Sequence, residues 1–160
     1  MTLRWLARDD GSALVETSIA CTVLLALVIG TMEMCMGLYT YHYTAQVARM
    51  ATRYAMVRGS SSCTSTPNLA QCNASASDIT SYVRGLGFPT ITASNLNVTT
   101  TWCASQGTTP ATWASCSGTT TNDPGNLVKV VVTYPYTLAV PFLSNVSFNV
   151  SSTSQAVIAQ

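Results

Sequence analysis

GSALVETSIACTVLLALVIGTMEMCMGL, residues 11–38, is the stretch that decides the fold of this 160-residue chain. Gly11 is followed five residues later by a lone glutamate, Glu16, and a long apolar run continues from it. The next charged residue is Glu33, and the 17 residue steps between the glutamates span roughly 25 Å of helix, close to the thickness of a bilayer's hydrocarbon core. The stretch therefore predicts one membrane-spanning helix over about residues 13–38, with a glutamate near each interface.

A cleavable secretory signal is the alternative interpretation of this apolar run. Such a signal has a shorter apolar core and ends at a small-residue cleavage site. Here the run is long and continues without a break into an amphipathic segment. This continuity favours an anchor that is retained in the mature protein.

Two roles are open for Glu16. A carboxylate in a membrane helix is costly unless it lies near the interface or is paired, so it tends to mark function. An amine a few residues away, in the same chain or in another, would supply a partner. The simpler alternative is an interfacial carboxylate that reaches the lipid headgroups.

An amphipathic helix is predicted to continue from the span. Its apolar face recurs with helical spacing and consists of Val47, Met50, Ala51 and Tyr54. Gln46, Arg49 and Arg53 fall on another face, and Gly59 is a typical helix end. The result is one continuous helix over residues 12–58, of which 39–58 form the amphipathic extension.

The remainder, residues 59–160, is predicted to be one small α+β domain. Residues 59–77 are rich in Ser, Thr and Asn and suggest a linker without regular structure, whereas residues 77–84 suggest a short helix capped by Ser75 or Ser77. Apolar residues then alternate with polar ones in three runs: 96–102, 128–136 and 146–150. We expect a small antiparallel β-sheet of about three strands, in which Pro135 and Pro141 restrict the second strand to an edge or end it early.

The cysteines indicate an exported domain. Cys63, Cys72, Cys103 and Cys116 all lie in the C-terminal part, an even number that fits disulfide bonds in an oxidising compartment. Sequential pairing, Cys63 with Cys72 and Cys103 with Cys116, is preferred among the three possible connectivities. We therefore place the N-terminus in the cytoplasm and the C-terminal domain outside. Cys21 and Cys35 fall in the predicted span and are expected to pack as small apolar residues.

The composition offers no support for catalysis or nucleic-acid binding. Only 8% of residues are charged and the net charge is +1, so no basic face for phosphates is expected. His42 is the only histidine and follows the span among tyrosines, where aromatic residues often mark the interface. We expect no catalytic residues, no metal site and no cofactor.

Three segments together resemble the N-terminal region of TadE/TadG-like pseudopilins of tight-adherence pili. They are Gly11 to Glu16, the second acid in Gly30-Thr-Met-Glu33, and the Ala- and Arg-rich run 45–59. Unlike many relatives, this chain has no proline in the apolar segment and has Thr17 where an aromatic residue is common. The resemblance covers residues 11–59.

This resemblance implies a minor pilin needed to assemble a tight-adherence (Flp-type) pilus. It implies a prepilin-type leader over residues 1–11 that a prepilin peptidase removes between Gly11 and Ser12, and intersubunit roles for Glu16 and Glu33. The implied partners are the cytoplasmic membrane, the prepilin peptidase, other pseudopilins, the major Flp-type pilin and the pilus assembly platform. A polymerising pilin or secretion-system pseudopilin, and a membrane-anchored surface-binding module with Trp102 and Trp113 as contacts, are the alternatives.

Overall fold

A computed structural model describes residues 6–104, 118–119, 121–139 and 146–159. The chain divides into two compact units, which we call the N-terminal unit, Met1–Leu38 with Thr137–Ser147, and the packed unit, Tyr39–Tyr136 with Phe148–Gln160. One long helix, α1 (Leu6–Met56), contributes to both units. The predicted α+β class, with a long N-terminal helix, short helices and a small antiparallel sheet, is confirmed.

The N-terminal part of α1 buries almost none of its apolar side chains. Large exposed residues follow one another along the helix: Leu14, Val15, Ile19, Val23, Leu24, Leu25, Leu27, Val28, Met32, Met34, Met36 and Leu38. Water is a poor solvent for such a surface, whereas lipid accepts it. The backbone hydrogen bonds of this part are made within the helix, whereas its apolar side chains contact little of the protein and suit a lipid environment.

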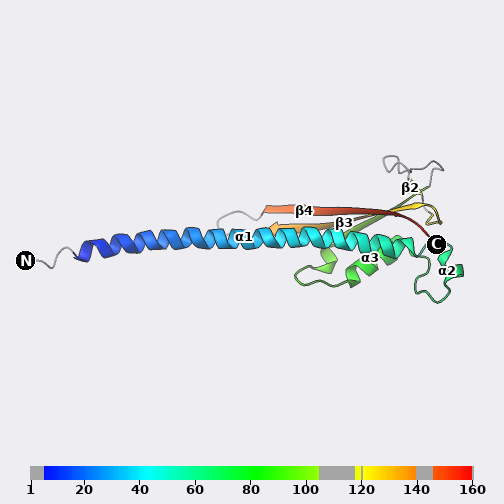
Figure 1. Cartoon of the computed structure of the whole chain (residues 1–160), viewed down its shortest axis with the longest axis horizontal. Coiled ribbons are helices and arrows are strands. Elements are labelled where there is room, and N and C mark those ends of the chain that lie inside the picture. Colours follow the sequence, from blue (N-terminus) through cyan, green and yellow to red (C-terminus); the bar gives the residue numbers. More distant parts are fainter. Residues whose placement is uncertain (1–5, 105–117, 120, 140–145, 160) are drawn as a thin grey trace, which may run out of the picture. The chain divides into compact units, whose positions relative to one another are not determined.

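In the packed unit, one face of the same helix packs into the core. Val47, Ala48 and Ala51 are fully buried, while Gln46, Arg49 and Arg53 are exposed, as the amphipathic pattern predicts. The small alanines allow neighbouring elements to approach the helix closely. Figure 1 shows helix α3 and strands β3 and β4 alongside this part of α1, and buried residues of α1, α3 and β3 belong to one cluster.

Helix α3 (Ala76–Gly85) begins at a complete capping box. The Ser75 side chain accepts a hydrogen bond from the Asp78 backbone N–H, and the Asp78 carboxylate accepts one from the Ser75 N–H. The helix buries Ile79 and Val83 against the core. The sequence identified this helix and proposed its cap, although the segment before it was expected to be irregular and contains a one-turn helix, α2 (Ser62–Ser65).

A four-stranded sheet, with strands of unequal length in the order β2-β1-β3-β4, completes the packed core. Its strands are β1 (Asn97–Cys103), β2 (Gly118–Thr119), β3 (Leu127–Leu138) and β4 (Val146–Val157). Strands β1 and β3 are antiparallel, and opposite pairs such as Thr100 with Val130 and Trp102 with Val128 share the inner face. The two-residue strand β2 is the only addition to the three predicted strands in the part of the chain described.

The prediction that Pro135 would make its strand an edge or end it early is wrong. Strand β3 continues through Pro135 to Leu138 and lies between β1 and β4. The last residue of β3 paired with β1 is Thr133, so Pro135 stands beyond the end of β1, where no β1 carbonyl requires its missing N–H. Pro141 lies outside the described residues.

Candidate functional site

The predicted cleavage site lies within α1. The helix begins at Leu6, so Gly11 and Ser12 are both helical and exposed. A Cβ placed on Gly11 would meet no heavy atom within 4 Å, which means that its surroundings are open. This Gly11–Ser12 bond is a surface feature of the chain, although cleavage there stays a prediction.

Glu16 is exposed and has no hydrogen-bond or ionic partner among the residues the structure describes. The hydroxyl groups around it behave differently, because they bond to carbonyls of their own helix. Thr17 donates to Ala13 O at 2.9 Å, and Ser18 donates to Val15 O at 2.8 Å. Such local bonds satisfy hydroxyl groups in an apolar environment. The Glu16 carboxylate differs from these hydroxyl groups, because no described residue bonds to it.

Glu33 is half-exposed and takes part in an interaction of its own. It lies 17 residues after Glu16 on one helix, so the two carboxylates are roughly 25 Å apart along the axis. They also project about 100° apart around the helix. The structure therefore does not bring the two predicted assembly residues together, and they are separate features of α1.

One helix in the described part of the chain, Gly11–Met56, is long and apolar enough to cross a membrane. Its most apolar 18-residue window has a mean hydropathy of 2.1 and none of that window is buried. Length, composition and exposure together suggest single-pass anchoring through the N-terminal part of α1.

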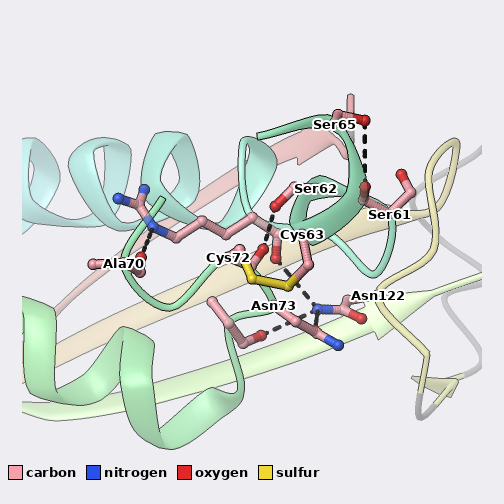
Figure 2. The surroundings of a disulfide bond; sticks show 10 residues. Ser61, Ser62, Cys63, Ser65, Ala70, Cys72, Asn73 and Asn122 are labelled. Carbon is pink, nitrogen blue, oxygen red and sulfur yellow. Dashed lines mark hydrogen bonds between the residues drawn. A yellow bond between two sulfur atoms is a disulfide. The ribbon is translucent and has the colours of Figure 1, made fainter. Parts of the chain in front are cut away.

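The predicted disulfide between Cys63 and Cys72 is present, with 4.8 Å between the two Cα atoms. Figure 2 shows the bond with polar contacts beside it, one within the same loop and one from Asn122 to the residue after Cys72. Ser62 Oγ donates to the Cys72 carbonyl, and Asn122 Nδ2 donates to Asn73 Oδ1 at 2.8 Å. The bridge therefore fixes the segment that leaves α1.

The other cysteines have different states. Cys103 lies in β1 and is disulfide-bonded, while Cys116 is outside the described residues, so their pairing stays a prediction. Cys21 and Cys35 are free and exposed on α1. They lie in the apolar half of the helix, and the expectation that they pack as small apolar residues stays a prediction.

An aromatic and cationic stack joins the end of α1 to α3. The guanidinium carbon of Arg58 lies 3.8 Å from the centre of the Tyr54 ring, and that ring stacks on Tyr82 at 4.2 Å. The Tyr54 hydroxyl donates to Gln71 Oε1 at 2.8 Å. These contacts give Arg58 a structural role within the chain, so its guanidinium group is already engaged.

Five exposed side chains of α1 form a surface that we call the arginine face. They are Tyr39, His42, Gln46, Arg49 and Arg53. Four of them, from His42 to Arg53, line a shallow groove along the helix. The sequence assigned Gln46, Arg49 and Arg53 to one side but did not connect them with Tyr39 and His42; the three- and four-residue spacing of all five was the signal available.

The described residues offer no arrangement suited to metal binding. No group of three His, Cys, Asp or Glu side chains that could hold an ion occurs among them. His42 is exposed and contacts the Tyr41 ring at 5.8 Å. Trp102, proposed as a surface contact, is half-buried against the core, and Trp113 lies outside the described residues.

Comparison with known proteins gives one family match, and it lies in the N-terminal part of the chain. Residues 11–53 match the family model described as TadE-like protein, which is just over a quarter of the chain. The resemblance to TadE-like proteins is thereby confirmed over residues 11–53. No curated protein matches the chain, and no solved structure matches it either. The matched region begins at Gly11 and ends at Arg53, so it contains Glu16, Glu33 and the arginine face.

Proposed function

We propose, from the TadE-like character of residues 11–53, that the chain is a minor pilin required to assemble a tight-adherence pilus. A prepilin peptidase cuts between Gly11 and Ser12 and removes residues 1–11. The new N-terminus stays on the cytoplasmic side of the inner membrane, residues 13–38 span it, and residues 59–160 form the extracytoplasmic domain. The protein acts by packing and positioning, without a catalytic step.

The observation that supports this proposal is Glu16, a carboxylate on an exposed apolar helix that has no partner among the described residues. A lone carboxylate in lipid costs several kcal/mol, and pairing with an amine lowers that cost. Cleavage after Gly11 creates an amine at Ser12. That amine, on an adjacent subunit, is the partner that Glu16 acquires when the helix enters a bundle.

Close packing of neighbouring helices is also possible along the span. A Cβ placed on Gly30 would meet no heavy atom within 4 Å, so nothing in the described chain covers this glycine. Small residues on membrane helices allow backbones to approach closely. Gly30 therefore supports assembly through helix contacts within the bilayer.

The outward orientation of the C-terminal domain rests on its disulfides. The Cys63–Cys72 bridge and the disulfide-bonded Cys103 require an oxidising compartment to persist. The cytoplasm keeps thiols reduced. This supports a topology in which α1 emerges from the membrane on the extracytoplasmic side before residue 63.

The first experiment determines the N-terminus of the mature protein in cells with and without the prepilin peptidase. We expect a protein that begins at Ser12, and an uncleaved one when the peptidase is absent. Retention of Met1 in wild-type cells would refute processing. Recovery of the protein throughout sheared filaments would instead indicate a polymerising subunit.

The second experiment tests Glu16 directly. Glu16→Ala removes the carboxylate but leaves the cleavage site, so we expect normal processing with pilus production lowered on the order of tenfold, the effect of losing one charge pair. Thr17→Ala is the matched control, because Thr17 is exposed and bonds only within its own helix. Normal pilus production by Glu16→Ala would contradict the intersubunit pairing.

A further inference from the structure

The arginine face has the geometry of a seam between two helices. Its five residues, at positions 39, 42, 46, 49 and 53, are spaced alternately three and four apart, and all five are exposed. This spacing is the one by which one helix contacts another along its length. Here it carries polar and cationic side chains instead of the usual apolar ones, so a partner must supply complementary polar groups.

The opposite side of this segment is already occupied. Val47, Ala51 and Tyr54 are buried in the packed unit's own core. A neighbouring helix that meets α1 beyond the membrane must therefore use the side where Arg49 and Arg53 lie. One side of the helix therefore packs against the core of its own chain, and none of the described residues covers the other side.

The two arginines of this face have no partner among the described residues, unlike Arg58 and Arg84. Arg58 stacks on Tyr54, and Arg84 donates to the Leu96 carbonyl at 3.3 Å. No hydrogen bond or ion pair joins Arg49 or Arg53 to another residue in the part of the chain that the structure describes. Side chains four residues apart on a helix are neighbours, about 6 Å apart, so the two guanidinium groups form a single cationic patch.

We infer that the arginine face docks an α-helix of a different membrane-anchored subunit, one that carries acidic side chains a helical turn apart just beyond its own span. The inference rests on the proposed role in assembling subunits. Within it, Arg49 and Arg53 pair with the two acids, while Tyr39, His42 and Gln46 complete the contact toward the membrane.

Lipid headgroups are a poorer fit for this patch. Arg49 follows the end of the predicted span, Leu38, by 11 residues, or about 16 Å of helix. The headgroup region on each side of a bilayer is only about 5 to 7 Å deep. Arg53 lies one turn further out. Both charges therefore stand beyond the anionic lipid surface and at the height of a neighbouring subunit.

A second copy of this chain is also a poorer fit. Two arginine faces would repel each other, because each brings two positive charges to the contact. Beyond residue 38 the chain has five basic residues and only two acidic ones, Asp78 and Asp123. Asp78 is engaged in the cap of α3, and Asp123 accepts a hydrogen bond from Ser60 at 2.6 Å. The chain thus has no acidic pair to offer.

Site-specific photo-crosslinking in cells that make the pilus tests this inference. A benzophenone amino acid replaces Gln46, at the centre of the face, in the full-length protein, and any adduct is identified by mass spectrometry. The same group at Thr153, exposed on β4, controls for random contacts. We expect an adduct at position 46 with one other membrane-anchored subunit that has two acids one turn apart beyond its span.

Charge reversal then tests the pairing. Arg49→Glu with Arg53→Glu is expected to lower the adduct at least about tenfold, since close interfacial charge pairs couple by that much or more. Reversing the partner's two acids to arginine is expected to restore it. Arg84→Glu with Lys129→Glu changes the net charge equally but is distant in sequence from the face, so the adduct is expected to stay.

Several outcomes would overturn the inference. They are an adduct with lipid, an adduct with a second copy of this chain, no protein adduct at position 46, or an adduct that is unaffected by reversal of Arg49 and Arg53. Failure of the proposed function gives a different pattern, since a deletion strain would then keep its pili or the mature N-terminus would remain Met1. If pili are lost when this chain is deleted but no adduct forms at position 46, only the docking inference fails.

Discussion

The two halves of α1 place apolar residues in opposite environments. In the first half Leu24 is 62% exposed and Leu27 is 66% exposed, whereas in the second half Val47 and Ala51 are fully buried. The more apolar half is the one without a protein core. This contrast shows that apolar content alone does not tell where a helix packs; the periodicity decides, because an all-round apolar surface suits lipid and a one-sided surface suits a core.

The largest expected effect comes from placing a carboxylate in each half. Val47→Asp would bury an unpaired charge in the packed unit, so we expect a loss of at least about 4 kcal/mol and no cooperative unfolding transition in detergent. Val23→Asp, on the exposed half, is expected to leave that transition unchanged but to hinder membrane insertion by about 3 kcal/mol. Circular dichroism and carbonate extraction measure the two effects. The contrast between the halves fails if both variants unfold alike.

Replacing cysteines compares the same two parts of the chain, with a smaller expected change in the free energy of unfolding. Replacing Cys63 and Cys72 by alanine opens a short loop, and we expect a loss of about 2 to 3 kcal/mol from the free energy of unfolding. Replacing the free Cys21 and Cys35 by alanine is expected to change it by less than about 0.5 kcal/mol. Denaturant titration of the detergent-solubilised protein measures both. Equal losses in the two double variants would mean that the exposed half also contributes to the fold.

The smallest expected effect is a pH dependence in the packed unit. The Ser75 side chain, followed by its backbone N–H, holds the pKa of the Asp78 carboxyl below its usual range through hydrogen bonds. Stability from this bond is therefore present above the unfolded pKa of about 4 and is lost as the pH falls through the lower folded value. We expect the difference in unfolding temperature between wild type and Asp78→Asn to shrink as the pH falls from about 5 to about 2. A difference that stays constant over this range would show that the carboxylate's charge does not support the cap.

Much of the packed unit could be predicted because local patterns and tertiary contacts agree there. The Ser75 cap, the buried face of Ile79 and Val83, and the inner face of β3 all follow from spacing in the sequence. The turn at Asn122 to Gly125 is similar: Pro124 fixes one dihedral, and Gly125 adopts a φ of +88°. Each of these elements needs only its own residues to select its conformation.

Other features depend on partners distant in the sequence. Thr90 adopts a φ of +67°, a value that disfavours a β-branched residue. It lies in the turn that the Ile91 N–H closes on the Phe88 carbonyl, and the Phe88 ring packs against Tyr43 at 4.5 Å. The Pro135 prediction failed for a related reason, since the length of β1 decides whether the missing N–H matters. The spacing of the arginine face is present in the sequence, but the exposure of its five side chains depends on what packs beside α1.

By itself, the sequence determined that the chain has one long helix whose first half is apolar on all sides. It also determined a disulfide-containing α+β domain and a resemblance to TadE-like proteins in the N-terminal region. These follow from composition and period, which each segment carries alone. The tertiary structure decided which side of α1 the domain covers, which arginines are already engaged, and how far β3 extends past Pro135. Those outcomes depend on what packs beside each residue, and packing is a property of the whole fold.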